Sequence, residues 1–187
     1  MQFPINLNLA GRRVLVVGGG RIALRKVEQL LPCGADITVI APQIVGDFAT
    51  LGVTLVQREY VAGDVADFRL VITATGNLSV DQQIYDECEA LGIWVNSADD
   101  PARCSFTLPA VHRQGSVMVA VSTGGASPAL SSRLRREIAQ LIGPEYADIA
   151  AALAAKRADI HARGISTEDI DWQPIIDEVL VAHGVSR

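Results

Sequence analysis

Three consecutive glycines near the start of the chain have the spacing of a phosphate-binding turn. The apolar run 14–17 leads through Gly18 and Gly20 into a helical pattern, which completes the spacing G-x-G-x-x-A at Ala23. Gly18 permits a tight turn, Gly20 lets a pyrophosphate approach the backbone, and Ala23 lets the helix pack close to the strand. The unpaired N–H groups of the first helical turn attract phosphate. We expect a dinucleotide here; a glycine-rich turn of another α/β protein is the alternative.

Polar residues also follow the later apolar runs. The second run ends in Pro42 and Gln43, where an NAD site usually carries an acid for the ribose and an NADP site favours an arginine. Neither is present, so either Gln43 and backbone groups hold the ribose or the cofactor differs. The missing arginine favours NAD over NADP. Thr75 follows the run 70–74, at an edge where ligands bind in parallel sheets. A simple turn is the alternative reading there.

Two acids follow the run 93–96. Asp99 and Asp100 precede Pro101, and a carboxylate at this edge can accept a proton or bind a cation. An aspartate before proline is equally typical of a turn. Spacing alone does not choose between these interpretations.

A second glycine- and serine-rich loop, residues 122–127, precedes a helix that begins near Pro128. Such a helix start favours anions, and arginines lie before and after it, which indicates a site for a polyanionic ligand. A solvated helix face is the alternative for each arginine. The candidate substrate contacts are Ser122, Thr123, Gly124, Ser127, Arg113, Arg133 and Arg136.

The elements that must position these residues alternate between strands and helices. Strands are expected at 14–17, 37–40, 53–56, 70–74 and 93–96, and helices at 23–31 and 80–91. This alternation predicts an α/β, Rossmann-like, doubly wound parallel sheet. Two strands at 105–110 and 116–122 and helices at 128–142, 147–163 and 172–182 are expected to follow. We predict three segments: a nucleotide domain 1–112, a strand-plus-helix segment 113–145 and a helical tail 146–187.

Bulk properties exclude several classes of protein. The 187 residues are 49% hydrophobic, enough for a core, and the net charge of −5 argues against nucleic-acid binding. No apolar stretch approaches the ~20 residues that span a bilayer, and the first residues do not form a signal peptide. Three cysteines without metal-type spacing indicate free thiols, so we expect a cytoplasmic protein. His112 is more typical of a structural histidine than of a metal ligand, and no metal site is predicted.

The motifs together resemble the precorrin-2 dehydrogenase family, which includes the amino-terminal module of bacterial siroheme synthase and the yeast bifunctional dehydrogenase–ferrochelatase. The resemblance covers about residues 1–145 and is only loose beyond them. It is carried by residues 16–26, 74–77, 95–106 and 119–128, in the family's order and spacing.

The resemblance implies the oxidation of precorrin-2 to sirohydrochlorin with NAD as hydride acceptor. Asp99 matches the family's catalytic acid, and Asp100 is the second choice. The carboxylates of the tetrapyrrole substrate are a partner for the arginines and the 122–127 loop. The implied NAD contacts are Gly18, Gly20, Arg21, Ile22, Pro42, Gln43 and Thr75.

The resemblance also implies a homodimer built through the 113–145 segment, with the tail contributing to the tetrapyrrole cleft. Thr123 stands where bacterial siroheme synthase has a serine that can be phosphorylated. The chain lacks the methyltransferase module of the fused enzyme, so precorrin-2 is expected from a separate uroporphyrinogen methyltransferase. Insertion of Fe²⁺ into sirohydrochlorin stays open, although the scarcity of histidine favours dehydrogenation alone. A non-catalytic NAD-binding sensor is the alternative from another class.

Overall fold

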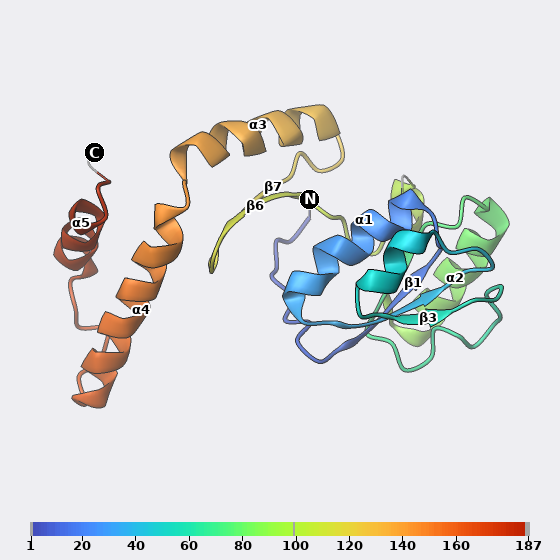
Figure 1. Cartoon of the computed structure of the whole chain (residues 1–187), viewed down its shortest axis with the longest axis horizontal. Helices are drawn as coiled ribbons and strands as arrows, with labels where there is room; N and C mark the ends of the chain where they lie inside the picture. The colour runs from blue at the N-terminus through green and yellow to red at the C-terminus, as the bar shows by residue number, and fades with distance from the viewer. Residues whose placement is uncertain (1, 99, 186–187) are drawn as a thin grey trace. The chain divides into compact units, whose positions relative to one another are not determined.

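The computed structural model describes residues 2–98 and 100–185, so Asp99 lies outside the described residues. The chain divides into two compact units, Met1–Leu108 and Pro109–Arg187 (Figure 1). This division falls just before the boundary that the sequence predicts after residue 112. The further boundary after residue 145 stays a prediction.

Five parallel strands form the sheet of the first unit, in the order β3-β2-β1-β4-β5. The strands are β1 (Arg13–Val17), β2 (Asp36–Ile40), β3 (Thr54–Val56), β4 (Leu70–Thr73) and β5 (Trp94–Ser97). Helix α1 (Arg21–Leu30) follows β1, and α2 (Leu78–Leu91) joins β4 to β5. Short 3₁₀ turns lie at Leu31–Cys33, Gly46–Thr50 and Pro101–Arg103. The predicted Rossmann-like parallel sheet is confirmed.

Strand β1 supplies both hydrophobic layers, because successive side chains of a strand point to opposite faces of the sheet. Val16 belongs to one buried cluster with Val27 of α1, whereas Val17 belongs to the other with Ile84 of α2. All four side chains are at most 2% exposed. Burying a side chain of this size contributes about 1.5–3 kcal/mol. The strand is therefore held from both sides, and its carboxyl end is a rigid support for the glycine loop.

Helix α2 begins at Leu78, slightly before the start expected at Val80, because Asn77 caps it. The Asn77 Oδ1 accepts a hydrogen bond from the backbone N–H of Ser79 at 3.1 Å, as is typical of an N-cap residue. The helix ends at Gly92, whose φ of 67° is left-handed. The cap fixes where the helix starts, directly after the end of β4.

The second unit opens with a hairpin of β6 (Ala110–Gln114) and β7 (Val117–Val121), joined at Gly115. The prediction of a strand over 105–110 is wrong, since β6 begins only at Ala110. Pro109 has no N–H to donate to a strand partner. Upstream, the backbone N–H of Ser105 donates to the Val95 carbonyl at 2.8 Å, which ties this stretch to β5 of the first unit.

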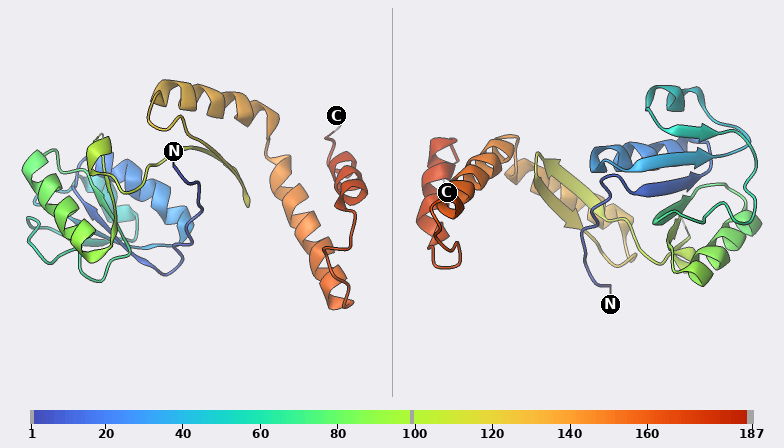
Figure 2. Two further views of the ribbon diagram at one scale, coloured as in Figure 1. Left: turned by 180° about the vertical axis from the view of Figure 1, so that it is seen from behind. Right: turned by 90° about the horizontal axis from the view of Figure 1, so that it is seen from below.

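Three helices complete the second unit, at bounds close to those expected: α3 (Pro128–Leu141), α4 (Glu145–Ala162) and α5 (Trp172–Ala182). Helices α4 and α5 lie side by side at the C-terminal end (Figure 2). Among the described residues of this unit, only Ile149 and Val179 are buried apolar side chains. Within the described part of the chain, no helix is long and apolar enough to cross a membrane.

Candidate functional site

The glycine loop lies between β1 and α1, and its three glycines meet different surroundings. A Cβ on Gly18 would lie 2.3 Å from the carbonyl oxygen of Ala74, and its φ of 129° is unfavourable for other residues. A Cβ on Gly19 would lie 2.1 Å from the carbonyl oxygen of Gln43. A Cβ on Gly20 would meet nothing within 4 Å. The first two glycines therefore let backbones pack, and the third leaves open space in front of the helix.

Helix α1 presents its first turn to that open space. Gly20 is the N-cap residue and makes no side-chain cap hydrogen bond. Arg21 and Ile22 are exposed, whereas Ala23 is fully buried against the sheet. Backbone N–H groups at a helix start have no acceptor inside the helix, so they can bind a phosphate. The observed space and donors fit the pyrophosphate of a dinucleotide.

The loop after β2 packs against the glycine loop. The backbone N–H of Val45 donates to the Gly19 carbonyl at 2.9 Å, and that of Gly18 donates to the Ile40 carbonyl at 2.9 Å. Pro42 and Gln43 are both exposed on this loop. They therefore stand where the ribose of a dinucleotide is expected, beside the phosphate position.

Thr75 follows β4 and takes part in a hydrogen-bond network. Its hydroxyl donates to the Asp81 carboxylate at 2.7 Å and accepts from the backbone N–H of Asn77 at 3.0 Å. Asp81 lies in the first turn of α2 and is only 7% exposed. The sequence reasoning missed Asp81; the signal was an acid in the first turn of a helix that starts at the ligand edge.

Gly19 was also missed. It occupies a variable position of the glycine spacing, where any residue type is formally allowed. The signal was the third glycine in an uninterrupted run. Its role depends on the loop after β2, which lies far along the chain.

The carboxyl ends of β4 and β5 are joined by side-chain and backbone hydrogen bonds. The Thr73 hydroxyl donates to the Ser97 hydroxyl at 3.1 Å, and the Ala98 N–H donates to the Thr73 carbonyl at 2.8 Å. Thr73 and Ser97 are buried. The predicted catalytic residue Asp99 comes next and lies outside the described residues.

Asp100, the second candidate, uses both carboxylate oxygens within its own loop. Its Oδ1 accepts from the backbone N–H of Ala102 at 3.1 Å, and its Oδ2 pairs with the guanidinium of Arg103. The Arg103 Nε donates in turn to the Gln82 side chain of α2 at 2.7 Å. This arrangement makes Asp100 a structural carboxylate rather than a free proton acceptor.

Cys104 closes the same loop as a protonated thiol. Burial raises the pKa of the Cys104 thiol, and its Sγ lies 3.3 Å from the Ser97 carbonyl and 3.1 Å from that of Asp100. Only thiolates are good nucleophiles and metal ligands. Within residues 2–98 and 100–185, no group of three or more His, Cys, Asp and Glu side chains is placed to hold a metal ion.

The loop before α3 uses its hydroxyl groups to hold its own conformation. Ser127 is the N-cap of α3 and accepts from the Leu130 N–H at 3.2 Å. The Thr123 hydroxyl accepts from the Ser127 N–H at 3.0 Å and lies 3.2 Å from the Ser131 hydroxyl. Ser122 is exposed and accepts from the Gly124 N–H at 3.1 Å. The loop is thus preorganised, and its contact with substrate stays a prediction.

The three candidate arginines of the second unit are all exposed. Arg113 lies on β6, and Arg136 lies on α3. Arg133 pairs with Glu137 at 2.8 Å, and that carboxylate raises the pKa of the Arg133 guanidinium. Their role in substrate binding stays a prediction. His112, by contrast, has a structural partner, since its Nε2 lies 2.7 Å from the Ile142 carbonyl.

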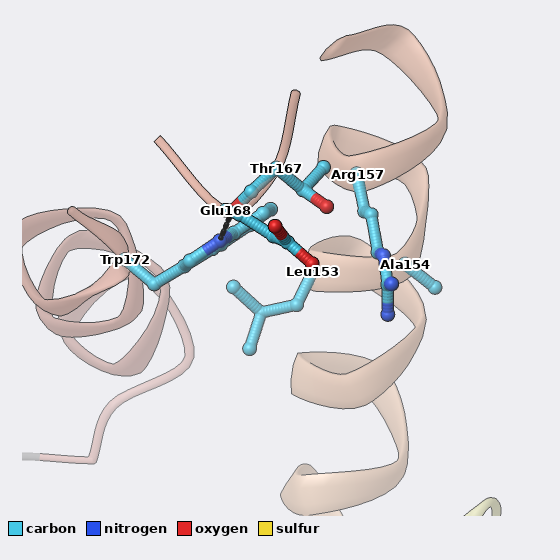
Figure 3. Close-up of a pocket in the computed structure, with 6 residues that line it drawn as sticks. All are labelled: Leu153, Ala154, Arg157, Thr167, Glu168 and Trp172. Carbon is cyan, nitrogen blue, oxygen red and sulfur yellow. Dashed lines mark hydrogen bonds between the residues drawn. The ribbon is translucent and has the colours of Figure 1, made fainter. Parts of the chain in front are cut away.

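A hollow of about 560 Å³ lies between α4 and α5 (Figure 3). It is lined by Leu153, Ala154, Arg157, Thr167, Glu168 and Trp172. The Trp172 indole N–H donates to the Thr167 carbonyl at 3.0 Å, so the ring is fixed in place. The lining combines apolar side chains with one cationic group, Arg157, and one anionic group, Glu168. The sequence reasoning did not single out Arg157.

A parallel sheet in this order, with a glycine loop where β1 and β4 meet, defines the dinucleotide-binding Rossmann-like class. Residues 5–110 match the model of the family described as putative NAD(P)-binding, and the chain belongs to this family. Residues 114–141 match the model described as sirohaem biosynthesis protein central. These matches confirm the resemblance inferred from the motifs.

Individual relatives support the same family assignment. The chain is 39% identical to a siroheme synthase of Nitrosococcus oceani, over 94% of this chain and 39% of the relative. It is 36% identical to a siroheme synthase of Pseudomonas putida, over 97% of this chain and 41% of the relative. The chain thus spans about two fifths of the length of these relatives. A solved structure described as SirC, precorrin-2 dehydrogenase, superposes with a TM-score of 0.74 at 25% identity, over 99% of this chain and 100% of that one.

Proposed function

We propose that this chain is an NAD-dependent dehydrogenase that oxidises precorrin-2 to sirohydrochlorin in siroheme biosynthesis. The observation that carries the proposal is the match to SirC, precorrin-2 dehydrogenase, which extends over essentially the whole of both chains. A match of this extent supports the same activity more strongly than the siroheme synthases do, because those relatives are much longer.

The residues around the glycine loop fit NAD, which accepts a hydride when it is bound. The loop and the first turn of α1 bind the pyrophosphate through Gly20, Arg21 and Ile22, and Gly18 gives the loop its tight turn, since its own N–H is bonded to the Ile40 carbonyl. Pro42 and Gln43 contact a ribose, and Thr75 contacts the cofactor at the end of β4. The protein's own contribution is orientation, which accounts for much of the rate in such reactions.

When two hydrogens are removed from the substrate, one leaves as a hydride and the other as a proton, which needs an acceptor. We assign this role to Asp99, by its match to the family motif. The engagement of Asp100 with Ala102 and Arg103 supports this choice between the two acids. A proton acceptor must be within hydrogen-bond reach of its proton and have no stronger partner.

The substrate carries carboxylates, so cationic and N–H donor groups suit its periphery. Arginines provide bidentate donors, and the start of α3, directly after the preorganised loop, favours negative charge. The proposed contacts are Ser122, Thr123, Gly124, Ser127, Arg113, Arg133 and Arg136.

The second unit supports a homodimer. A stable unit of this size needs a substantial buried core, yet its described residues bury only two apolar side chains. The apolar residues of β7 are half-buried or exposed in the single chain. A second copy that packs on the β6–β7 hairpin would cover them.

We place the enzyme in the cytoplasm, which suits its free cysteines. A separate methyltransferase as the source of precorrin-2 stays a prediction.

The test is an anaerobic absorbance time course with enzymatically generated precorrin-2. We expect sirohydrochlorin to form only when both protein and NAD are present. Addition of Fe²⁺ after completion tests the open second activity: an enzyme-accelerated conversion to siroheme establishes iron insertion, and the spontaneous rate restricts the protein to dehydrogenation. If the folded protein binds NAD and produces no sirohydrochlorin, the dehydrogenase is refuted and a non-catalytic NAD sensor takes its place.

A further inference from the structure

We infer that Asp81 is a positioning residue that makes Thr75 a hydrogen-bond acceptor towards the bound dinucleotide. The inference rests on the proposed function, since it specifies how the NAD site recognises its ligand. It concerns three described residues, Thr75, Asn77 and Asp81, at the carboxyl end of β4.

Thr75 lies next to the glycine turn. Strands β1 and β4 are neighbours in the sheet, and a Cβ on Gly18 would lie 3.3 Å from the Thr75 backbone nitrogen. Thr75 therefore lies directly against the glycine turn, at the crevice where the strand order reverses. A ligand seated on the glycine loop passes next to this residue.

The hydrogen bonds of the Thr75 hydroxyl leave one position open. A hydroxyl has one proton to donate and two lone pairs to accept with. The proton has two acceptors in reach, the Asp81 carboxylate at 2.7 Å and the Asn77 carbonyl at 3.2 Å. The charged and closer acceptor takes it. One lone pair receives the Asn77 N–H at 3.0 Å, which leaves one lone pair for a ligand.

Burial of the Asp81 carboxylate at the start of α2 has a free-energy cost. The carboxylate is only 7% exposed, and burying a charge is unfavourable unless it is compensated. Its place in the first turn of α2 offsets part of that cost, because negative charge is stabilised at a helix start. A buried carboxylate held in one position fixes the direction of the threonine proton.

The chemical consequence is that only a donor group of the ligand can bond to Thr75. The dinucleotide offers three kinds of donor: the ribose hydroxyls, the carboxamide N–H of the nicotinamide and the amino group of the adenine. Its phosphates carry only acceptors at neutral pH. Thr75 thus recognises one of these donors and does not contact a phosphate.

Calorimetric titration of the full chain with NAD tests this inference without any turnover. We expect Thr75→Val to weaken NAD binding about five- to tenfold, the loss of one hydrogen bond. Asp81→Leu should weaken it by about three- to tenfold, and the double variant should bind no worse than Thr75→Val alone. Thr75→Ser keeps the hydroxyl, so it should stay within about twofold of the wild type.

A parallel titration with ADP-ribose, which lacks the nicotinamide, identifies the donor. Equal weakening for both ligands assigns a ribose hydroxyl or the adenine amino group, and weakening for NAD alone assigns the carboxamide; either supports the inference. Unchanged affinity in Thr75→Val overturns it, as does an additive double variant. If Asp81→Leu does not fold by circular dichroism, Asp81→Ala replaces it. A wild type that binds neither ligand refutes the proposed function itself.

Discussion

Alanine at Gly19 and alanine at Gly20 should have opposite consequences, although the two positions are adjacent. At Gly19 the new Cβ would lie 2.1 Å from the Gln43 carbonyl oxygen and 2.9 Å from the Ile44 Cα. Both neighbours are backbone, so the loop after β2 must move. Forcing a methyl group into such a packed place costs about 1–3 kcal/mol. For a chain of this length, that lowers the melting temperature by roughly 2–4 °C per kcal/mol.

At Gly20 the same methyl group meets no protein atom within 4 Å. The residue is the N-cap of α1 with φ −90°, which alanine adopts without strain. The stability loss should stay at or below about 1 kcal/mol, the usual cost of a poorer cap residue. The methyl group does, however, fill the space that we assign to the pyrophosphate. We therefore expect NAD affinity to fall at least about tenfold, or about 1.4 kcal/mol.

Thermal unfolding and calorimetric titration with NAD separate the two effects. Gly19→Ala should mainly lower the melting temperature, and Gly20→Ala should mainly weaken NAD binding. The reasoning is refuted if Gly20→Ala binds NAD like the wild type, or if Gly19→Ala is as stable as the wild type. Gly46→Ala serves as the matched control, since its Cβ also meets nothing within 4 Å.

Three further predictions concern catalysis, pH and assembly. Asp99→Asn should lower kcat at least about 100-fold in the precorrin-2 assay, whereas Asp100→Asn should stay within about threefold; the reverse order would exchange their roles. Burial raises the pKa of the Cys88 thiol to about 12, so the folded thiol keeps a proton that the unfolded one releases above about pH 9. Stability should therefore fall as the pH rises from 9, and Cys88→Ala should show a shallower fall in urea unfolding between about pH 9 and 11; identical slopes would contradict this. Ala120→Asp, at the exposed position of β7, should give a monomer in light scattering, and a dimeric variant would exclude this hairpin as the interface.

Much of the fold of the first unit can be predicted from local patterns in the sequence. Apolar runs separated by helical periodicity predict a parallel sheet, because only strands covered on both faces are continuously apolar. The glycine spacing places the cofactor loop, since Gly18 needs a positive φ that other residues avoid. These features depend on residues that are near one another in the chain.

Features that depend on distant contacts could not be predicted in this way. The pattern of residues 105–110 predicts a strand, but the Ser105 N–H donates to the Val95 carbonyl. Residue spacing does not reveal this contact. The role of Gly19 depends on Gln43, and the burial of Asp81 depends on how α2 packs. The spacing of the two adjacent acids does not distinguish them, and the family motif favours Asp99 without a physical reason; the bonds of Asp100 to Ala102 and Arg103 supply one.

The unequal burial of the two units has a consequence for how the chain matures during synthesis. All the buried apolar side chains among the described residues, except Ile149 and Val179, belong to residues 1–108. The first unit can therefore fold around its sheet as soon as it leaves the ribosome. The hairpin and helices that follow have no comparable driving force of their own. These elements should fold last, and their folded state should become more stable as the protein concentration rises if a second copy packs against them.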